Sequence, residues 1–79
     1  MESLKELVAR VLGVSKDEIN NESSPDNIKS WDSFNGLMLV SELEMRFDVK
    51  FSIDEVMGVT KYKDIKDALE KHNVREGID

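Results

Sequence analysis

The chain of 79 residues is long enough for one small domain with a single apolar core, and this size argues against a deep catalytic cleft. It contains no cysteine, which excludes disulfides, thiolate metal sites and a cysteine nucleophile, so any thiol chemistry must come from a cofactor. A formal net charge of −6 argues against nucleic-acid partners and favours basic protein partners.

The first predicted helix covers Leu4–Leu12, where the apolar residues fall on one side at about 100° per residue. Gly13 is a suitable residue to end it. A long polar connection follows over residues 14–32. Within this connection Ser15 and Glu18 have the spacing of a capping box, which predicts one helical turn.

A second helix is predicted to begin at Asp32 or Ser33 and to run to about Phe47, because this stretch contains no proline and a single glycine. One side of the helix is the expected core face, formed by Leu39, Val40, Leu43 and Phe47. The opposite side is also apolar: it consists of Phe34, Met38 and Met45, flanked by Leu37 and Ser41, with Glu42 and Glu44 at the borders.

Two apolar sides on one helix are unusual in a domain that is too small to cover both. An exposed apolar patch that contains methionine is typical of a surface that binds several proteins transiently. We therefore expect this outer side, together with Glu55 and Val56 further along the chain, to bind partner proteins. The alternative is that Phe34 and Leu37 fold back against the long connection.

A short helix is expected after Ser52, which forms a second capping-box pattern with Glu55, and Gly58 is a suitable residue to end it. Thr60 is then expected to cap the last helix. The buried stripe of that helix is predicted to be Tyr62, Ile65, Ala68 and Leu69. Residues 73–79 are expected to be frayed.

Three main helices and one short helix, with no convincing strand, predict an all-α four-helix bundle. We expect a single domain over residues 1–79 with its core at about residues 3–72. The first residues lack the basic and apolar pattern of a secretion signal, and no segment reaches membrane-spanning length. The sequence is therefore expected to give a cytoplasmic monomer that does not insert into membranes.

The head of the second helix reads Trp31-Asp32-Ser33-Phe34-Asn35, and here the sequence resembles the acyl carrier protein family. That family has Asp-Ser followed by a large apolar residue at this place, after a long loop. The resemblance extends over about residues 4–69. It includes the apolar rhythm and helix end formed by Leu39, Val40, Leu43, Glu44 and Phe47.

The resemblance implies that a separate phosphopantetheinyl transferase attaches 4′-phosphopantetheine from coenzyme A to Ser33. The chain would then carry acyl groups as thioesters on this arm and present them to acyl-transferring and acyl-modifying enzymes of fatty acid, polyketide or related synthesis. The family associates Asp32 with the metal-bound complex of the transferase, and Asp is also a good helix N-cap. A phosphodiester on Ser33 suits the first turn of a helix, where the backbone favours negative charge.

The sequence departs from the family pattern just before the serine. Carriers of housekeeping fatty acid synthesis usually read Gly-Ala-Asp-Ser-Leu-Asp, whereas this chain has Ser30-Trp31-Asp32-Ser33-Phe34-Asn35. The difference favours a specialised carrier. Trp31 is expected to anchor the long connection by packing.

Three other functions were weighed against a carrier. An enzyme is disfavoured because the single histidine, His72, lies late in the last helix, and no base is placed to activate Ser33. A calcium loop that starts at Asp26 would have Trp31 where glycine is required, and one that starts at Asp32 would have an apolar third ligand position. An unmodified helical protein-interaction module is the alternative that the sequence leaves open.

Overall fold

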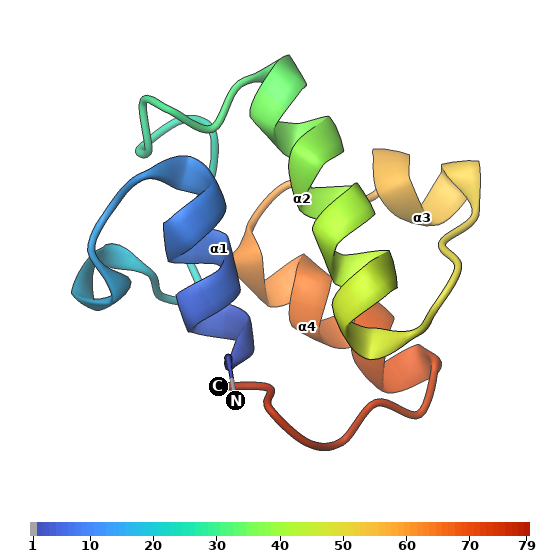
Figure 1. Cartoon of the computed structure of the whole chain (residues 1–79). Helices are drawn as coiled ribbons and strands as arrows, with labels where there is room; N and C mark the ends of the chain where they lie inside the picture. The colour runs from blue at the N-terminus through green and yellow to red at the C-terminus, as the bar shows by residue number, and fades with distance from the viewer. Residues whose placement is uncertain (1) are drawn as a thin grey trace.

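The computed structural model describes residues 2–79, and in this range its only regular elements are helices. The elements in chain order are α1 (Leu4–Leu12), the 3₁₀ turn η1 (Lys16–Glu18), α2 (Ser33–Phe47), α3 (Ile53–Met57) and α4 (Tyr62–Lys71), as Figure 1 shows. The predicted fold class, an all-α bundle of three main helices and one short helix, is confirmed. None of these helices is long and apolar enough to cross a membrane.

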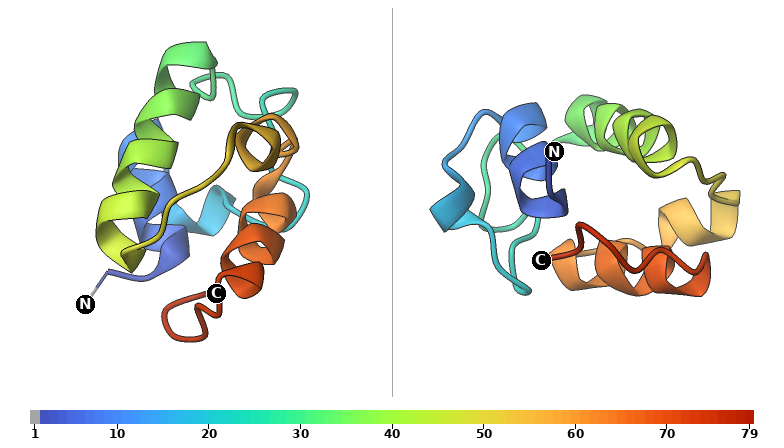
Figure 2. Two further views of the ribbon diagram at one scale, coloured as in Figure 1. Left: turned by 90° about the vertical axis from the view of Figure 1, so that its right-hand side faces the viewer. Right: turned by 60° about the horizontal axis from the view of Figure 1, so that its bottom comes forward.

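The helices surround one core, with α3 beside α2 and α4 (Figures 1 and 2). The long connection between α1 and α2 runs along the outer side of α1 (Figure 2). Each main helix and the long connection contribute apolar side chains to this core. Its members include Leu4, Leu7, Val8, Leu12, Ile19, Ile28, Trp31, Leu39, Leu43, Tyr62, Ile65 and Leu69.

Serine side chains begin several of the helical segments. The predicted capping boxes at Ser15 and Ser52 are both present, and a third at Ser3 begins α1. At its other end α1 stops at Gly13, whose φ of 68° favours glycine. The sequence predicted the bounds of α1 and α2 well because these stop and start signals are local.

The prediction that Thr60 caps the last helix was wrong. The N-cap residue of α4 is Lys61, and its side chain makes no capping hydrogen bond. Thr60 instead donates from its backbone amide and its hydroxyl to the carboxylate of Asp64, at 2.9 and 2.7 Å. These bonds from Thr60 lower the pKa of the Asp64 carboxyl.

The long connection supplies the acceptors that a side-chain cap would have provided to α4. The amide of Tyr62 donates to the carbonyl of Ser23 at 2.8 Å, and the amide of Lys63 donates to the carbonyl of Asn21 at 3.2 Å. Ser23 is itself buried, and its hydroxyl donates to the carbonyl of Glu18 at 3.2 Å. The connection is therefore tied to α4 by hydrogen bonds as well as by its apolar residues.

Residues 73–79, which the sequence predicted to be frayed, make defined contacts with the start of α1 and with the core. The amide of Leu4 donates to the carbonyl of Gly77 at 2.6 Å, and the amide of Lys5 donates to the Asp79 carboxylate at 2.9 Å. Val74 and Ile78 pack against the core. The first amides of a helix have no acceptor within their own helix. The tail therefore supplies the acceptors for the first two amides of α1.

Candidate functional site

The first turn of α2 is held in place by the residues that precede it. Asp32 is the N-cap: its carboxylate accepts from the amide of Asn35 at 2.9 Å, and its carbonyl accepts from the amide of Gly36 at 2.8 Å. The Asn35 side chain donates back to the carbonyl of Ser30 at 2.7 Å. The long connection and the helix thus fix the position of Ser33, the first residue of α2.

Ser33 is exposed, and its surroundings favour a negatively charged substituent. The amides of Ser33 and Phe34 donate to no acceptor within residues 2–79, since the Asp32 cap reaches only Asn35 and Gly36. These free amides lie at the positive end of the dipole of a helix of 15 residues. The arrangement suits a phosphate group on the Ser33 hydroxyl.

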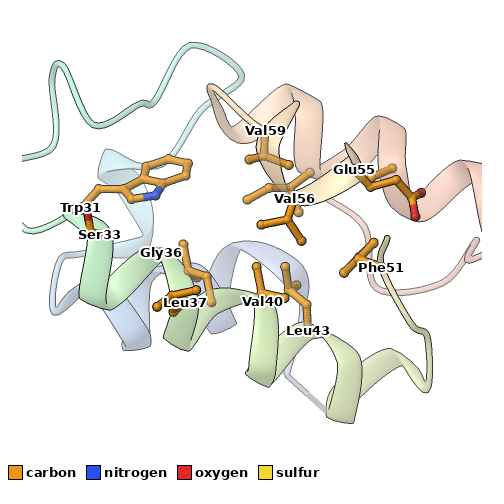
Figure 3. A pocket seen from close by; sticks show the side chains of 13 residues that line it. Trp31, Ser33, Gly36, Leu37, Val40, Leu43, Phe51, Glu55, Val56 and Val59 are labelled. Atoms are coloured by element: carbon orange, nitrogen blue, oxygen red, sulfur yellow. The ribbon is translucent and has the colours of Figure 1, made fainter. Parts of the chain in front are cut away.

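An apolar cavity of about 200 Å³ begins next to Ser33 and extends between α2, α3 and α4 (Figure 3). Its walls are mostly apolar. The lining consists of Trp31, Ser33, Gly36, Leu37, Leu39, Val40, Leu43, Phe51, Glu55, Val56, Val59, Ile65 and Ala68. A space with these walls accepts an apolar group more readily than a polar one.

Trp31 belongs both to the core and to this cavity. Its side chain is buried in the core cluster, as expected of an anchor for the long connection. It also forms the cavity wall beside Ser33, with the nitrogen edge of the indole nearest to Gly36 (Figure 3). The packing role of Trp31 was predicted from the sequence, whereas its place in the cavity wall depends on residues of other helices.

The outer side of α2 is exposed, as its two-sided pattern predicted. Phe34, Leu37, Met38 and Met45 keep 70, 67, 41 and 73% of their surface exposed. The alternative, in which Phe34 and Leu37 fold back against the long connection, is therefore wrong. The opposite side packs inward, with Leu39 and Leu43 fully buried.

The carboxylates on α2 are engaged inside the molecule. Glu42 accepts a hydrogen bond at 2.8 Å from the guanidinium of Arg10 on α1, which also binds Glu2 at 2.7 Å. Glu44 accepts from the amide of Phe51 at 2.9 Å. The sequence placed Glu42 at the border of the outer side of α2. Because its carboxylate is bound to Arg10, the outer side is more apolar than this placement suggested.

The two expected partner-binding residues of α3 differ in their surroundings. Both residues line the cavity, but the carboxylate of Glu55 in addition accepts from the amide of Ser52 and binds the His72 imidazole at 2.9 Å. The amide of Ser52 and the imidazole of His72 lower the pKa of the Glu55 carboxyl. His72 also packs edge-on against Phe51, with 5.4 Å between the ring centres. The His72 side chain therefore connects the end of α4 to α3. Among the described residues 2–79, no hydrogen bond joins His72 to Ser33.

Two further apolar residues of α3 are exposed, and neither was predicted to be so from the sequence. Ile53 and Met57 each keep 77% of their surface exposed. They lie four positions apart, and this spacing places them on one side of a helix. A helix of five residues is too short for its two sides to be told apart from the sequence.

The chain was compared with known families and with solved structures. The family model that describes the phosphopantetheine attachment site matches residues 2–69. The fold is similar to the solution NMR structure of the holo acyl carrier protein from Geobacter metallireducens, with a TM-score of 0.78 and 25% sequence identity. This match covers 86% of the present chain and 78% of the other. The chain therefore belongs to the acyl carrier protein family, whose members are non-catalytic carriers with a covalently attached 4′-phosphopantetheine.

Proposed function

We propose that Ser33 is the residue that bears the 4′-phosphopantetheine and that the chain presents acyl groups from this position to the enzymes that transfer and modify them. The observation that carries the proposal is the place of Ser33. It is an exposed hydroxyl on the first turn of the longest helix, with an apolar cavity beside it.

The residues around Ser33 fit such a prosthetic group. The two free amides of the first turn can donate hydrogen bonds to the oxygens of a phosphodiester, and the exposed hydroxyl is accessible to a modifying transferase. When bound, the group supplies a terminal thiol that this chain lacks and on which acyl groups are held as thioesters. Asp32 holds the helix start in place, and we propose that it also meets the metal-bound complex of the transferase.

The cavity is proposed to shelter the hydrocarbon part of the acyl group. Its lining of aliphatic and aromatic residues gains by removing apolar surface from water, at about 25 cal/mol for each Å² that is buried. Because Ser33 is part of the lining, a group attached there has direct access to the cavity.

The exposed apolar residues of α2 are proposed to bind the enzymes that act on the cargo. Phe34 directly follows Ser33, so an enzyme that reaches the modified serine must come close to this surface. Val56, Glu55 and Glu42 are proposed to support the contact from the edges. Fatty acid, polyketide or related acyl synthesis in the cytoplasm is the proposed setting, and the absence of cysteine fits a reducing compartment.

Intact-mass measurement tests the proposal. The chain is incubated with coenzyme A, Mg²⁺ and a broad-specificity phosphopantetheinyl transferase, and we expect the mass to rise by one phosphopantetheine. Ser33→Ala should abolish the gain. Ser41→Ala, which changes another exposed serine of α2, should leave it intact. No gain in the unaltered chain would instead support an unmodified protein-interaction module.

A further inference from the structure

The only tryptophan of the chain is a polar donor in an apolar wall. Trp31 is 6% exposed and lines the cavity beside Ser33. None of the hydrogen bonds formed within residues 2–79 uses its indole Nε1. The side chain as a whole is buried, but Nε1 is not among the buried polar atoms that lack a partner, so this N–H group is accessible to an acceptor in the cavity. The wall therefore contains a donor that the fold itself does not use.

The space in front of this donor is open because Gly36 has no side chain. Apart from the adjacent residues and the backbone of the helix itself, a Cβ at Gly36 would have a single atom within 4 Å, Nε1 of Trp31 at 3.9 Å. In Figure 3 the indole lies over Gly36, one turn along α2 from Ser33. No side chain at position 36 therefore covers the N–H group from this side.

The other polar groups of the lining are already committed. The carboxylate of Glu55 is held by Ser52 and His72, and the hydroxyl of Ser33 is the proposed attachment point. A purely hydrocarbon cargo would offer the indole no acceptor. The donor thus points to a cargo or arm that brings an oxygen to this part of the cavity.

We propose that the indole N–H of Trp31 donates a hydrogen bond to a carbonyl oxygen of the group attached to Ser33. This inference rests on the proposed function. Two sources supply such an oxygen: the amides of the pantetheine arm, and the acyl group with its thioester carbonyl or a further oxygen on the chain. In either case Trp31 is a positioning residue, because it holds the attached group in the cavity without reacting with it.

The single indole N–H resonance of the ¹⁵N-labelled protein tests the proposal. It is recorded for the apo chain and for forms loaded with phosphopantetheine alone, with its hexanoyl thioester and with its 3-oxohexanoyl thioester. We expect the indole proton to move downfield and its exchange with solvent to slow in at least one loaded form. A changed indole resonance in the form without an acyl group assigns the acceptor to the pantetheine arm. A change that appears with both acyl groups, but not without them, assigns it to the thioester carbonyl. A change confined to the 3-oxohexanoyl form assigns it to the oxygen on the acyl chain.

Trp31→Phe separates a hydrogen bond from simple burial, because phenylalanine keeps the aromatic packing and lacks the N–H group. We expect hydroxylamine to release the acyl group from this variant roughly two to ten times faster than from the unaltered protein, as for the loss of one neutral hydrogen bond. Equal release rates, or an indole resonance that stays unchanged in every loaded form, would overturn the proposal. Intact mass reports the modification of Ser33 separately, so failure here is distinguishable from failure of the carrier function.

Discussion

At the scale of single residues, the site depends on how the start of α2 is capped. Asp32 accepts a hydrogen bond from the amide of Asn35, and this bond leaves the amides of Ser33 and Phe34 free. The residue type alone allows two roles for Asp32, as an N-cap and as a contact for the modifying transferase. The two roles respond differently to substitution, because asparagine retains the cap and loses the charge.

Substitution of Asp32 distinguishes these roles. We expect Asp32→Asn to keep nearly all the stability of the protein, and Asp32→Ala to lose about 1 kcal/mol of unfolding free energy in urea titration. We also expect Asp32→Asn to slow the addition of phosphopantetheine in a mass time course, because the metal-bound complex of the transferase loses a carboxylate. If the asparagine variant is modified at the original rate, Asp32 is a cap only.

A second residue-scale prediction concerns acid stability. The pKa of Glu55 is lowered from its ordinary value of 4.5, chiefly by the amide of Ser52 and further by His72. A carboxyl with a lowered pKa stabilises the fold fully above the ordinary value, and this contribution is lost as pH falls through the lowered value. Glu55→Gln keeps an acceptor for the cap and removes the titration.

The measurement is urea unfolding of both proteins from about pH 7 to about pH 3, a range that spans carboxyl titration. We expect Glu55→Gln to be the less stable protein at neutral pH, and the difference to shrink as the solution becomes acidic. Other carboxyls with lowered pKa values, such as those of Glu2 and Asp64, are present in both proteins and cancel in the comparison. A difference that is the same at every pH would contradict the assignment.

At the scale of elements, α2 has two apolar sides in different environments. Its inner side is buried in the bundle, and its outer side is exposed beside the first turn that contains Ser33. The carboxylates of Glu42 and Glu44 are bound within the molecule. We therefore expect the outer side to bind partner enzymes chiefly by apolar contact, with an affinity that depends only weakly on salt.

Substitutions on the two sides of α2 should have opposite consequences. Leu39→Ala, at a position that is 2% exposed, is expected to cost about 2–5 kcal/mol of unfolding free energy. Met45→Glu, at a position that is 73% exposed, is expected to change stability by no more than about 0.5 kcal/mol. Met45→Glu should instead lower kcat/KM for modification by the transferase.

The control for Met45→Glu is Lys16→Gln, which makes the same change in net charge on the exposed turn η1. We expect this control to leave kcat/KM nearly unchanged. Loss of helix by circular dichroism in Met45→Glu, with normal kinetics in the protein that remains folded, would show that the outer side of α2 supports the fold and not docking.

At the scale of the whole molecule, segments that are distant in the sequence complete the bundle. The tail accepts hydrogen bonds from the first amides of α1, and the long connection accepts them from the first amides of α4. Both segments satisfy helix ends that the helices cannot satisfy themselves. The cavity depends on the same assembly, because α2, α3 and α4 each supply part of its wall.

The tail should contribute to stability without affecting the site. Ile78→Ala removes a partly buried side chain that packs against the core, and we expect it to cost about 1 kcal/mol in urea titration, as for a partly buried apolar side chain. Arg75→Ala, at an exposed position of the same tail, is the matched control and should be close to neutral. Both variants should be modified on Ser33 at the original rate, and a slowed rate in Ile78→Ala alone would link the tail to the site.

The sequence by itself determined the parts of this protein that depend on local signals. Periodicity and stop residues predicted the helices, the head of α2 indicated Ser33 as the candidate attachment residue, and the excess of apolar residues predicted an exposed outer side on α2. Only the tertiary structure decided which groups meet across the bundle. Arg10 forms an ion pair with Glu42, the tail accepts a hydrogen bond from the start of α1, and Trp31 lines a cavity. The physical reason is that helix formation depends on neighbours within a few positions, whereas a cavity or an ion pair depends on distant residues that only folding brings together.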